Sequence, residues 1–288
     1  MPRALVLGGE TGLLGQEIVK RLHEKEWFVE TLGRKDGDMQ DEGFVTQKID
    51  TTGPDVVFNT IAWTQVDDAE DHPEAARAVN ADFPAMLARL LGKTKAHLVH
   101  FSTDFIFDTE TRTPIREESA PAPQSVYGKT KALGEEYLTS LLPTQSTIIR
   151  TAWLFGPARK NFVATIVNAA KGRSELRVVA DQTGSPTYTP DLATWSVALA
   201  EERASGIWHG INAGFATWHA LASKALELAQ IECSVVPITS NEWPQKAKRP
   251  TYSVLDGSKL DRFLATKKMV RRSWESALAD YIKKLINA

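Results

Sequence analysis

The segment Ala4-Leu5-Val6-Leu7-Gly8-Gly9-Glu10-Thr11-Gly12-Leu13-Leu14-Gly15 joins a short apolar run to a glycine-rich turn, and helical periodicity begins near Gln16. Gly9, Gly12 and Gly15 form the pattern GxxGxxG. Glycine permits a tight turn and a close approach of the backbone to a pyrophosphate, and the following helix N-terminus adds unpaired N–H groups. The strand, turn and helix together therefore predict a dinucleotide-binding site that contains these three glycines.

Short apolar runs alternate with amphipathic stretches through the first half of the sequence. Further strands are expected at 28–32, 56–60, 97–102 and 147–150, with helices such as 17–25 and 73–91 between them. This alternation is typical of βαβ units, in which right-handed crossovers put helices on both faces of the sheet. We therefore predict an α/β fold with a doubly wound, Rossmann-like parallel sheet.

The regular alternation of expected strands and helices does not continue in the second half of the sequence. After Gly156 prolines break the rhythm, and four of the eight tryptophans gather between Trp195 and Trp243, which favours a smaller, mixed α/β substrate-binding lobe. We expect the Rossmann domain at residues 1–155 and the smaller lobe mainly at residues 156–288. Because residues 206–212 alternate like a strand, a segment near 190–213 is expected to rejoin the main sheet.

Composition argues against several classes of protein. The net charge of −2 gives no strong field for nucleic acid or anionic membrane, and the hydrophobic and charged contents, 42% and 24%, are ordinary for a globular protein. The one cysteine, Cys233, excludes an intrachain disulfide and suits a reducing compartment. The apolar run 4–7 is too short for a signal sequence or a membrane span. We expect a cytoplasmic protein without a nucleic-acid or membrane partner.

The six histidines suggest no metal site. His97 and His100 lie three residues apart on an expected strand, and side chains at that spacing point to opposite faces of a sheet. No metal is therefore predicted from the histidines.

The residues at the end of the second strand indicate whether the cofactor is NADH or NADPH. An acid there would bind the adenosine ribose of NADH, and an arginine would bind the 2′-phosphate of NADPH. The sequence there is Gly33-Arg34-Lys35. Arg34 favours NADPH because the guanidinium fork matches phosphate geometry. Asp36 and Asp38 follow closely, so NADH stays possible.

Three side chains form a candidate catalytic group. Tyr127 and Lys131 lie one helical turn apart, and a fixed ammonium near the phenol would lower its pKa toward physiological pH. Thr103 follows the expected strand 97–102, at the sheet edge where open α/β sheets bind ligands. Together Thr103 and Tyr127 can hold one carbonyl oxygen while a nicotinamide delivers hydride to the carbon.

Longer stretches carry a family resemblance. The most specific is Gly184-Ser185-Pro186-Thr187-Tyr188, and the others are the glycine turn and residues 59–64, 66–67, 69–70, 80–81, 102–108, 126–131, 134–135, 150–156, 160–162, 181–183 and 249–250. With these stretches the chain resembles the extended short-chain dehydrogenase/reductase family, and within it the dTDP-4-dehydrorhamnose reductases. The resemblance covers most of the chain.

The resemblance implies an oxidoreductase that uses NADPH to reduce the 4-keto group of dTDP-4-dehydro-6-deoxy-L-mannose to dTDP-L-rhamnose. Tyr127 would protonate O4, Lys131 would bind the nicotinamide ribose and acidify Tyr127, and Thr103 would orient the carbonyl. Asp104 and Trp153 would border the sugar of the nucleotide-sugar substrate.

The resemblance also implies the cofactor contacts. Gly12, Leu13 and Leu14 would line the pyrophosphate, Asp50 and Thr51 the adenine, and Ala62, Trp63 and Thr64 the nicotinamide half. Some family members form magnesium-assisted dimers through acidic side chains. Those ligands cannot be matched in this sequence, so Mg²⁺ is left open and a homodimer is only an expectation.

Three alternatives remain open at this point. One is a reductase of a related nucleotide 4-keto sugar, and another is an epimerase or dehydratase on the same scaffold, because fold does not fix function. Dehydratases of the superfamily carry a glutamate after the Thr-Asp pair, where this chain has Phe105. The third is a non-catalytic regulatory subunit resembling methionine adenosyltransferase β, against which the retained Thr103, Tyr127 and Lys131 argue.

Overall fold

The main body of the protein is a six-stranded parallel sheet. We analysed a computed structural model that describes residues 1–108, 112–243 and 245–287. The strand order is β10-β5-β4-β3-β1-β2, and every neighbouring pair runs parallel. The order reverses between β1 and β3, which is the topological switch point of a doubly wound sheet. The predicted Rossmann-like fold is confirmed by strands β1 (Arg3–Leu7), β2 (Phe28–Leu32), β3 (Val56–Asn59), β4 (His97–Thr103), β5 (Ser146–Thr151) and β10 (Gly206–His209).

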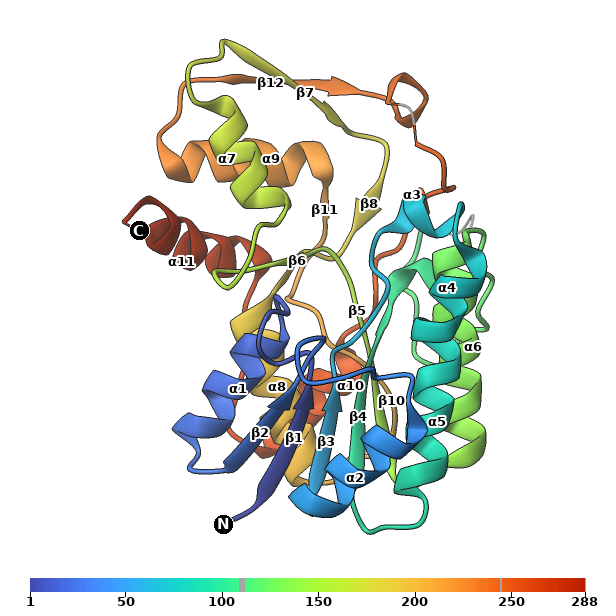
Figure 1. The fold of residues 1–288 in the computed structure, drawn as a ribbon. Coiled ribbons are helices and arrows are strands. Elements are labelled where there is room, and N and C mark those ends of the chain that lie inside the picture. Colours follow the sequence, from blue (N-terminus) through green and yellow to red (C-terminus); the bar gives the residue numbers. More distant parts are fainter. Residues whose placement is uncertain (109–111, 244, 288) are drawn as a thin grey trace.

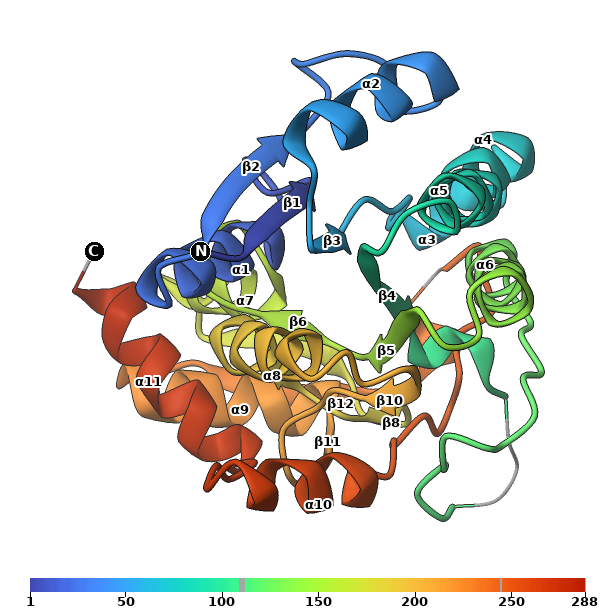
Figure 2. The ribbon, with the colours of Figure 1, turned by 90° about the horizontal axis from the view of Figure 1, so that it is seen from below.

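Helices cover both faces of this sheet (Figure 2). Alternation along β1 shows why: Ala4 and Val6 join the core under one helical layer, and Leu5 and Leu7 join the core under the other. The first layer contains α1 (Gly15–Glu24), α8 (Thr189–Glu201) and α10 (Ser258–Thr266), and the second contains α2 (Glu42–Thr52), α5 (Phe83–Leu91) and α6 (Val126–Leu141).

A smaller mixed lobe lies beyond the carboxyl ends of the central strands (Figure 1). Its core joins three helices, α7 (Phe162–Ala170), α9 (Trp218–Ala229) and α11 (Trp274–Ile286). Three two-stranded ladders complete it: β7 (Glu175–Val179) with β12 (Ser234–Ile238), β8 (Thr183–Gly184) with β11 (Ala216–Thr217), and β6 (Leu154–Phe155) with β9 (Thr187–Tyr188).

The chain passes between the two regions more than once. Elements α8, β10 and α10 pack on the main sheet although they lie beyond residue 155 in sequence. The remaining short elements are α3 (Val66–Ala69), α4 (Pro73–Arg77), the π-helix η1 (Ala78–Asp82), and the 3₁₀ helices η2 (Asp104–Ile106), directly after β4, and η3 (Ser240–Glu242), directly after β12. Across the described ranges, no helix is long and apolar enough to cross a membrane.

A buried ion pair fixes α6 to the sheet. Arg150 on β5 and Glu135 on α6 are 2% and 4% exposed. Arg150 Nε and Nη2 donate to the Glu135 carboxylate at 3.0 and 2.7 Å, and Nη1 donates to the Glu117 carbonyl at 2.9 Å. Charges this deeply buried are tolerated only when they are paired and hydrogen-bonded.

Glu135→Gln should reduce the free energy of unfolding by about 3 kcal/mol, because the buried guanidinium loses its counter-charge. Urea unfolding followed by circular dichroism measures the change. The matched control is Glu136→Gln, one residue further along α6 and exposed, which should change stability by less than about 0.5 kcal/mol. Equal effects of the two substitutions would contradict the structural role of the pair.

Candidate active site

The glycine turn closes tightly on itself. Gly12 N–H donates to Gly8 O at 3.1 Å, and a Cβ placed on Gly15 would lie 2.5 Å from the same oxygen. A side chain at residue 15 would therefore push the turn away from the start of α1. Within the described residues no side chain caps α1, so its first N–H groups face the edge where a pyrophosphate would sit. The residues fit a dinucleotide phosphate.

The turn after β2 carries Arg34. Its side chain is exposed at the carboxyl edge of the sheet, and Asp36 Oδ2 accepts from Gly33 N at 2.7 Å, which shapes the turn. This edge of the sheet also holds the glycine turn.

The expectation for Asp50 and Thr51 is wrong. Both are exposed in the last turn of α2, which leads into the amino end of β3, on the opposite edge of the sheet from the glycine turn. Asp41 caps α2 by accepting from Gly43 N and Phe44 N, a signal that a helix runs through residue 50. Asp38 and the buried Met39 lie before this cap at the correct edge, and sequence reasoning gave them no adenine role.

Asn80 fixes the loop after β3. This buried side chain in η1 accepts from Trp63 N at 2.9 Å and donates to Trp63 O at 3.2 Å and to Thr130 Oγ1 at 3.1 Å. It therefore ties the loop of Ala62, Trp63 and Thr64 to helix α6. Sequence reasoning quoted Asn80 within a motif without assigning this function, which only a contact between distant segments reveals.

The start of α6 determines where Tyr127 lies. Ser125 Oγ accepts from Gly128 N at 3.1 Å, and Glu70 Oε1 accepts from Val126 N at 2.8 Å. A Cβ on Gly128 would lie 2.2 Å from Phe105 O, so glycine is needed for α6 to approach η2 this closely. The Tyr127 ring packs edge-on against Phe105, with centroids 5.5 Å apart.

Burial controls the protonation of Tyr127 and Lys131. It raises the pKa of Tyr127 to about 12, and a hydrogen bond with the Thr103 side chain acts in the opposite direction. Burial lowers the pKa of Lys131 to about 8, against the attraction of Glu135. Lys131 does not contribute to the pKa shift of Tyr127, because Lys131 Nζ donates to Phe101 O at 2.5 Å, on β4, and burial dominates at the phenol. The expected acidification of Tyr127 by Lys131 stays a prediction.

Asp104 connects β4 with the smaller lobe. Its carboxylate accepts from Thr103 Oγ1 at 3.2 Å and from Ser253 Oγ at 2.6 Å. Ser253 is held in turn by its own N–H, which donates to Thr183 O at 2.9 Å. Burial raises the pKa of Asp104 to about 6 despite these hydrogen bonds. The structure thus brings Thr103, Asp104 and Tyr127 together.

Trp153 belongs to the smaller lobe's aromatic core. Its indole stacks on Trp218 with centroids 3.6 Å apart and an interplanar angle of 7°. Its backbone has φ 47°, an uncommon conformation for a large side chain and one that often marks a functional site. The half-buried ring lies between β5 and β6, in the segment that joins the sheet to the lobe.

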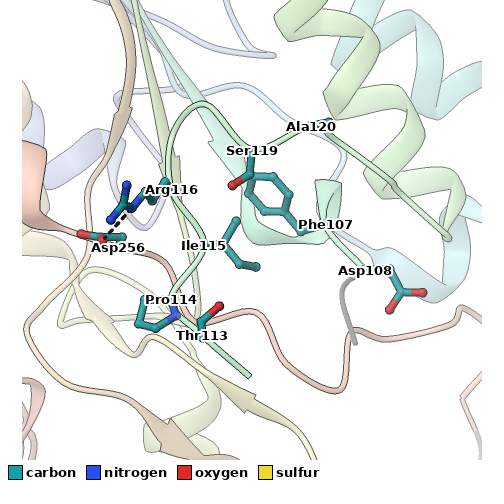
Figure 3. Close-up of a pocket in the computed structure, with 9 residues that line it drawn as sticks. All are labelled: Phe107, Asp108, Thr113, Pro114, Ile115, Arg116, Ser119, Ala120 and Asp256. Carbon is teal, nitrogen blue, oxygen red and sulfur yellow. Dashed lines mark ion pairs between the residues drawn. The ribbon is translucent and has the colours of Figure 1, made fainter. Parts of the chain in front are cut away.

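A separate hollow of about 660 Å³ opens beside η2 (Figure 3). Phe107 and Ile115 form its apolar floor, and Arg116 and Asp256 approach to 3.9 Å at its side. Neither Tyr127 nor Lys131 lines it, so it is distinct from the group around Thr103. Among the residues that the structure describes, no cluster of three histidine, cysteine or acidic side chains offers a metal site.

The parallel sheet, the glycine turn and the Tyr127-to-Lys131 helix define a short-chain dehydrogenase/reductase type of protein. Residues 3–287 match the family model described as RmlD substrate binding domain. The chain belongs to this family.

Relatives with known names agree with that assignment. The chain is 39% identical to a dTDP-4-dehydrorhamnose reductase of Streptomyces griseus, over 97% of this chain and 92% of the relative. It is 38% identical to a dTDP-4-keto-6-deoxy-D-glucose reductase of Streptomyces niveus, over 86% of each. The solved dTDP-4-dehydrorhamnose reductase of Bacillus anthracis in complex with NADP superimposes with a TM-score of 0.92 at 30% identity, over 99% of this chain and 100% of that one.

Asp104 should make stability depend on pH. Its pKa in the folded protein, about 6, lies above the ordinary 3.8, so the folded state binds this proton more tightly and loses stability as pH rises from about 4 to about 6. Asp104→Asn lacks this dependence. Its free energy of unfolding should therefore gain about 3 kcal/mol relative to the unsubstituted protein between about pH 4 and pH 7. Urea unfolding across this range tests it, and parallel pH profiles would contradict it.

Proposed function

We propose that the protein reduces the 4-keto group of dTDP-4-dehydro-6-deoxy-L-mannose with NADPH and forms dTDP-L-rhamnose. The observation that carries the proposal is the meeting of Thr103 and Tyr127 at the carboxyl end of β4, beside the glycine turn. The name of the Streptomyces griseus relative supports the substrate, and NADP in the Bacillus anthracis structure supports the cofactor.

The cofactor half of the site is assigned as follows. Gly9, Gly12 and Gly15, with Leu13 and Leu14, hold the pyrophosphate at the start of α1, and Arg34 binds the 2′-phosphate. Residues 62–64 line the nicotinamide half, and Lys131 binds its ribose. When bound, the nicotinamide supplies the hydride.

The substrate half of the site is assigned from the protonation state of Tyr127. Thr103 and Tyr127 hold the carbonyl oxygen, and Tyr127 donates the proton that the product hydroxyl needs. A phenol whose pKa is about 12 is fully protonated at neutral pH, as a proton donor must be. Asp104 and Trp153 border the sugar, and the second of these presents an aromatic surface from the smaller lobe.

A related sugar is the second candidate, because the Streptomyces niveus relative at 38% identity is named for another dTDP-4-keto sugar. Both candidates keep the same proton donor and cofactor site and differ in the configuration of the 4-keto sugar that is bound. A homodimer and a cytoplasmic location stay predictions, and light scattering would test the first.

The test incubates the protein with NADPH and dTDP-4-dehydro-6-deoxy-L-mannose, follows absorbance at the cofactor band and identifies the product sugar by NMR. We expect one cofactor oxidised for each dTDP-L-rhamnose formed. Sugar conversion without net cofactor loss would identify an epimerase. Faster NADPH oxidation in a parallel assay with dTDP-4-keto-6-deoxy-D-glucose would identify the second candidate. No turnover together with co-purification of a synthetase subunit would favour the regulatory alternative.

Tyr127→Phe should lower kcat by a factor of about 10² to 10⁴ while the Kd for NADPH changes little, because the substitution removes a proton donor and leaves the phosphate contacts. Steady-state kinetics and fluorescence titration measure the two quantities. Tyr137→Phe, on the same helix and half-buried, is the control and should leave kcat unchanged. Near-normal turnover of Tyr127→Phe would exclude Tyr127 as the donor.

Arg34→Ala should raise the KM for NADPH by about tenfold and leave the KM for NADH nearly unchanged, because only NADPH carries the phosphate that the guanidinium binds. Steady-state kinetics with each cofactor gives the comparison, and NADH serves as the internal control. Equal changes for both cofactors would show that Arg34 makes no phosphate contact.

A further inference from the structure

His100 is a buried histidine that contacts Lys131 and has no role in the proposed mechanism. Asn59 on β3 and His100 on β4 are opposite each other in the parallel register. Their neighbours Val57 and Leu98 belong to the core under α6, so alternation points both polar side chains at that helix. His100 is 0% exposed and Lys131 is 1% exposed. The three side chains form a continuous contact from the sheet to α6.

The orientation of Asn59 fixes which nitrogen of His100 carries the proton. Asn59 Oδ1 accepts from Ile61 N at 3.1 Å, so Nδ2 is the atom that faces His100 Nδ1 at 3.1 Å. An amide NH₂ can only donate, so Nδ1 must accept. Burial lowers the pKa of His100 well below its ordinary value, so the ring is neutral and its single proton lies on Nε2.

This tautomer determines what His100 offers to Lys131. His100 Nε2 lies 3.3 Å from Lys131 Nζ. An ammonium has only N–H donors, so one donor would face another at the His100 Nε2–H. A neutral amine has a lone pair that accepts the hydrogen bond from Nε2–H. Nζ still donates to Phe101 O at 2.5 Å. All contacts of the amine are satisfied only when Lys131 is uncharged.

We propose that His100 is a positioning residue that donates its Nε2 proton in a hydrogen bond to the Lys131 amine and so increases the share of neutral amine when no cofactor is bound. Binding of the cofactor ribose draws Nζ away from His100, and the amine then takes one proton from water or buffer to become the ammonium. The other titratable groups near Lys131 are Tyr127 and Glu135 on α6, Arg150 on β5 and Asp104 on η2. Arg150 is paired with Glu135.

The proposal depends on the proposed role of Lys131 only in its second step. The charge of Lys131 in the cofactor-free protein can be measured without cofactor or substrate. A failure of the proposal about His100 is therefore distinguishable from a failure of the proposed function. The probe is the pH titration of the Lys131 side-chain ¹³Cε resonance, assigned by its loss in Lys131→Met.

His100→Phe should raise the pKa of Lys131 toward its ordinary value, by about one pH unit or more, because the opposing N–H is removed. The opposite tautomer predicts the opposite sign, since the ammonium would lose an acceptor and the pKa of Lys131 would fall. The matched control is His97→Phe, which removes a buried histidine of the same strand that contacts Thr147 instead. It should leave the titration of Lys131 unchanged, and a fall or no change in His100→Phe overturns the proposal.

A second measurement uses the unsubstituted protein, in case His100→Phe does not fold. NADPH binding is measured calorimetrically at about pH 8 in buffers of different ionisation enthalpy, where the cofactor 2′-phosphate is already fully ionised. We expect uptake of a substantial fraction of one proton per bound cofactor, decreasing at about pH 6.5. Zero uptake at about pH 8 overturns the proposal, because Lys131 would already be the ammonium.

Discussion

The close approach of α6 to β4 and β5 is the constraint on which the candidate site depends. Gly128 lets the helix start against the Phe105 carbonyl, and the buried pair of Glu135 and Arg150 holds its middle. Tyr127 lies directly before the first of these points, and Lys131 lies between the two. A shift of α6 by the size of one methyl group would separate the phenol from Thr103, so packing along the helix determines the chemistry at its start.

Desolvation is the dominant electrostatic effect at this junction. It raises the pKa of Tyr127 and Asp104 and lowers that of Lys131 and His100. Each shift favours the uncharged form, because a charge in this region has few water molecules or counter-charges to stabilise it. The buried region thus supports a protonated phenol beside a lysine whose charge responds to its partners.

The smaller lobe is connected to this junction by its last segment before α10. Ser253 donates to Asp104, and Arg249 pairs with Asp67 at 2.7 Å at the start of α3. Lys246 makes a further contact with Asp71. The lobe therefore reaches the carboxyl end of β4 through hydrogen bonds and ion pairs, while its own stability comes from the aromatic core around Trp153 and Trp218. This arrangement links the smaller lobe to the end of β4 where Thr103 and Asp104 lie.

Periodicity and turn chemistry are local properties of the chain, so the sheet, the glycine turn and the spacing of Tyr127 and Lys131 are predictable from the residues alone. The position of Asp50 depends on a helix that begins at the Asp41 cap nine residues earlier, so the prediction for Asp50 is wrong. The contacts of Asn80 with Trp63, of Ser253 with Asp104 and of His100 with Lys131 form only in the folded protein. These contacts, and the pKa shifts that burial imposes, arise between segments far apart in sequence, so no local pattern encodes them.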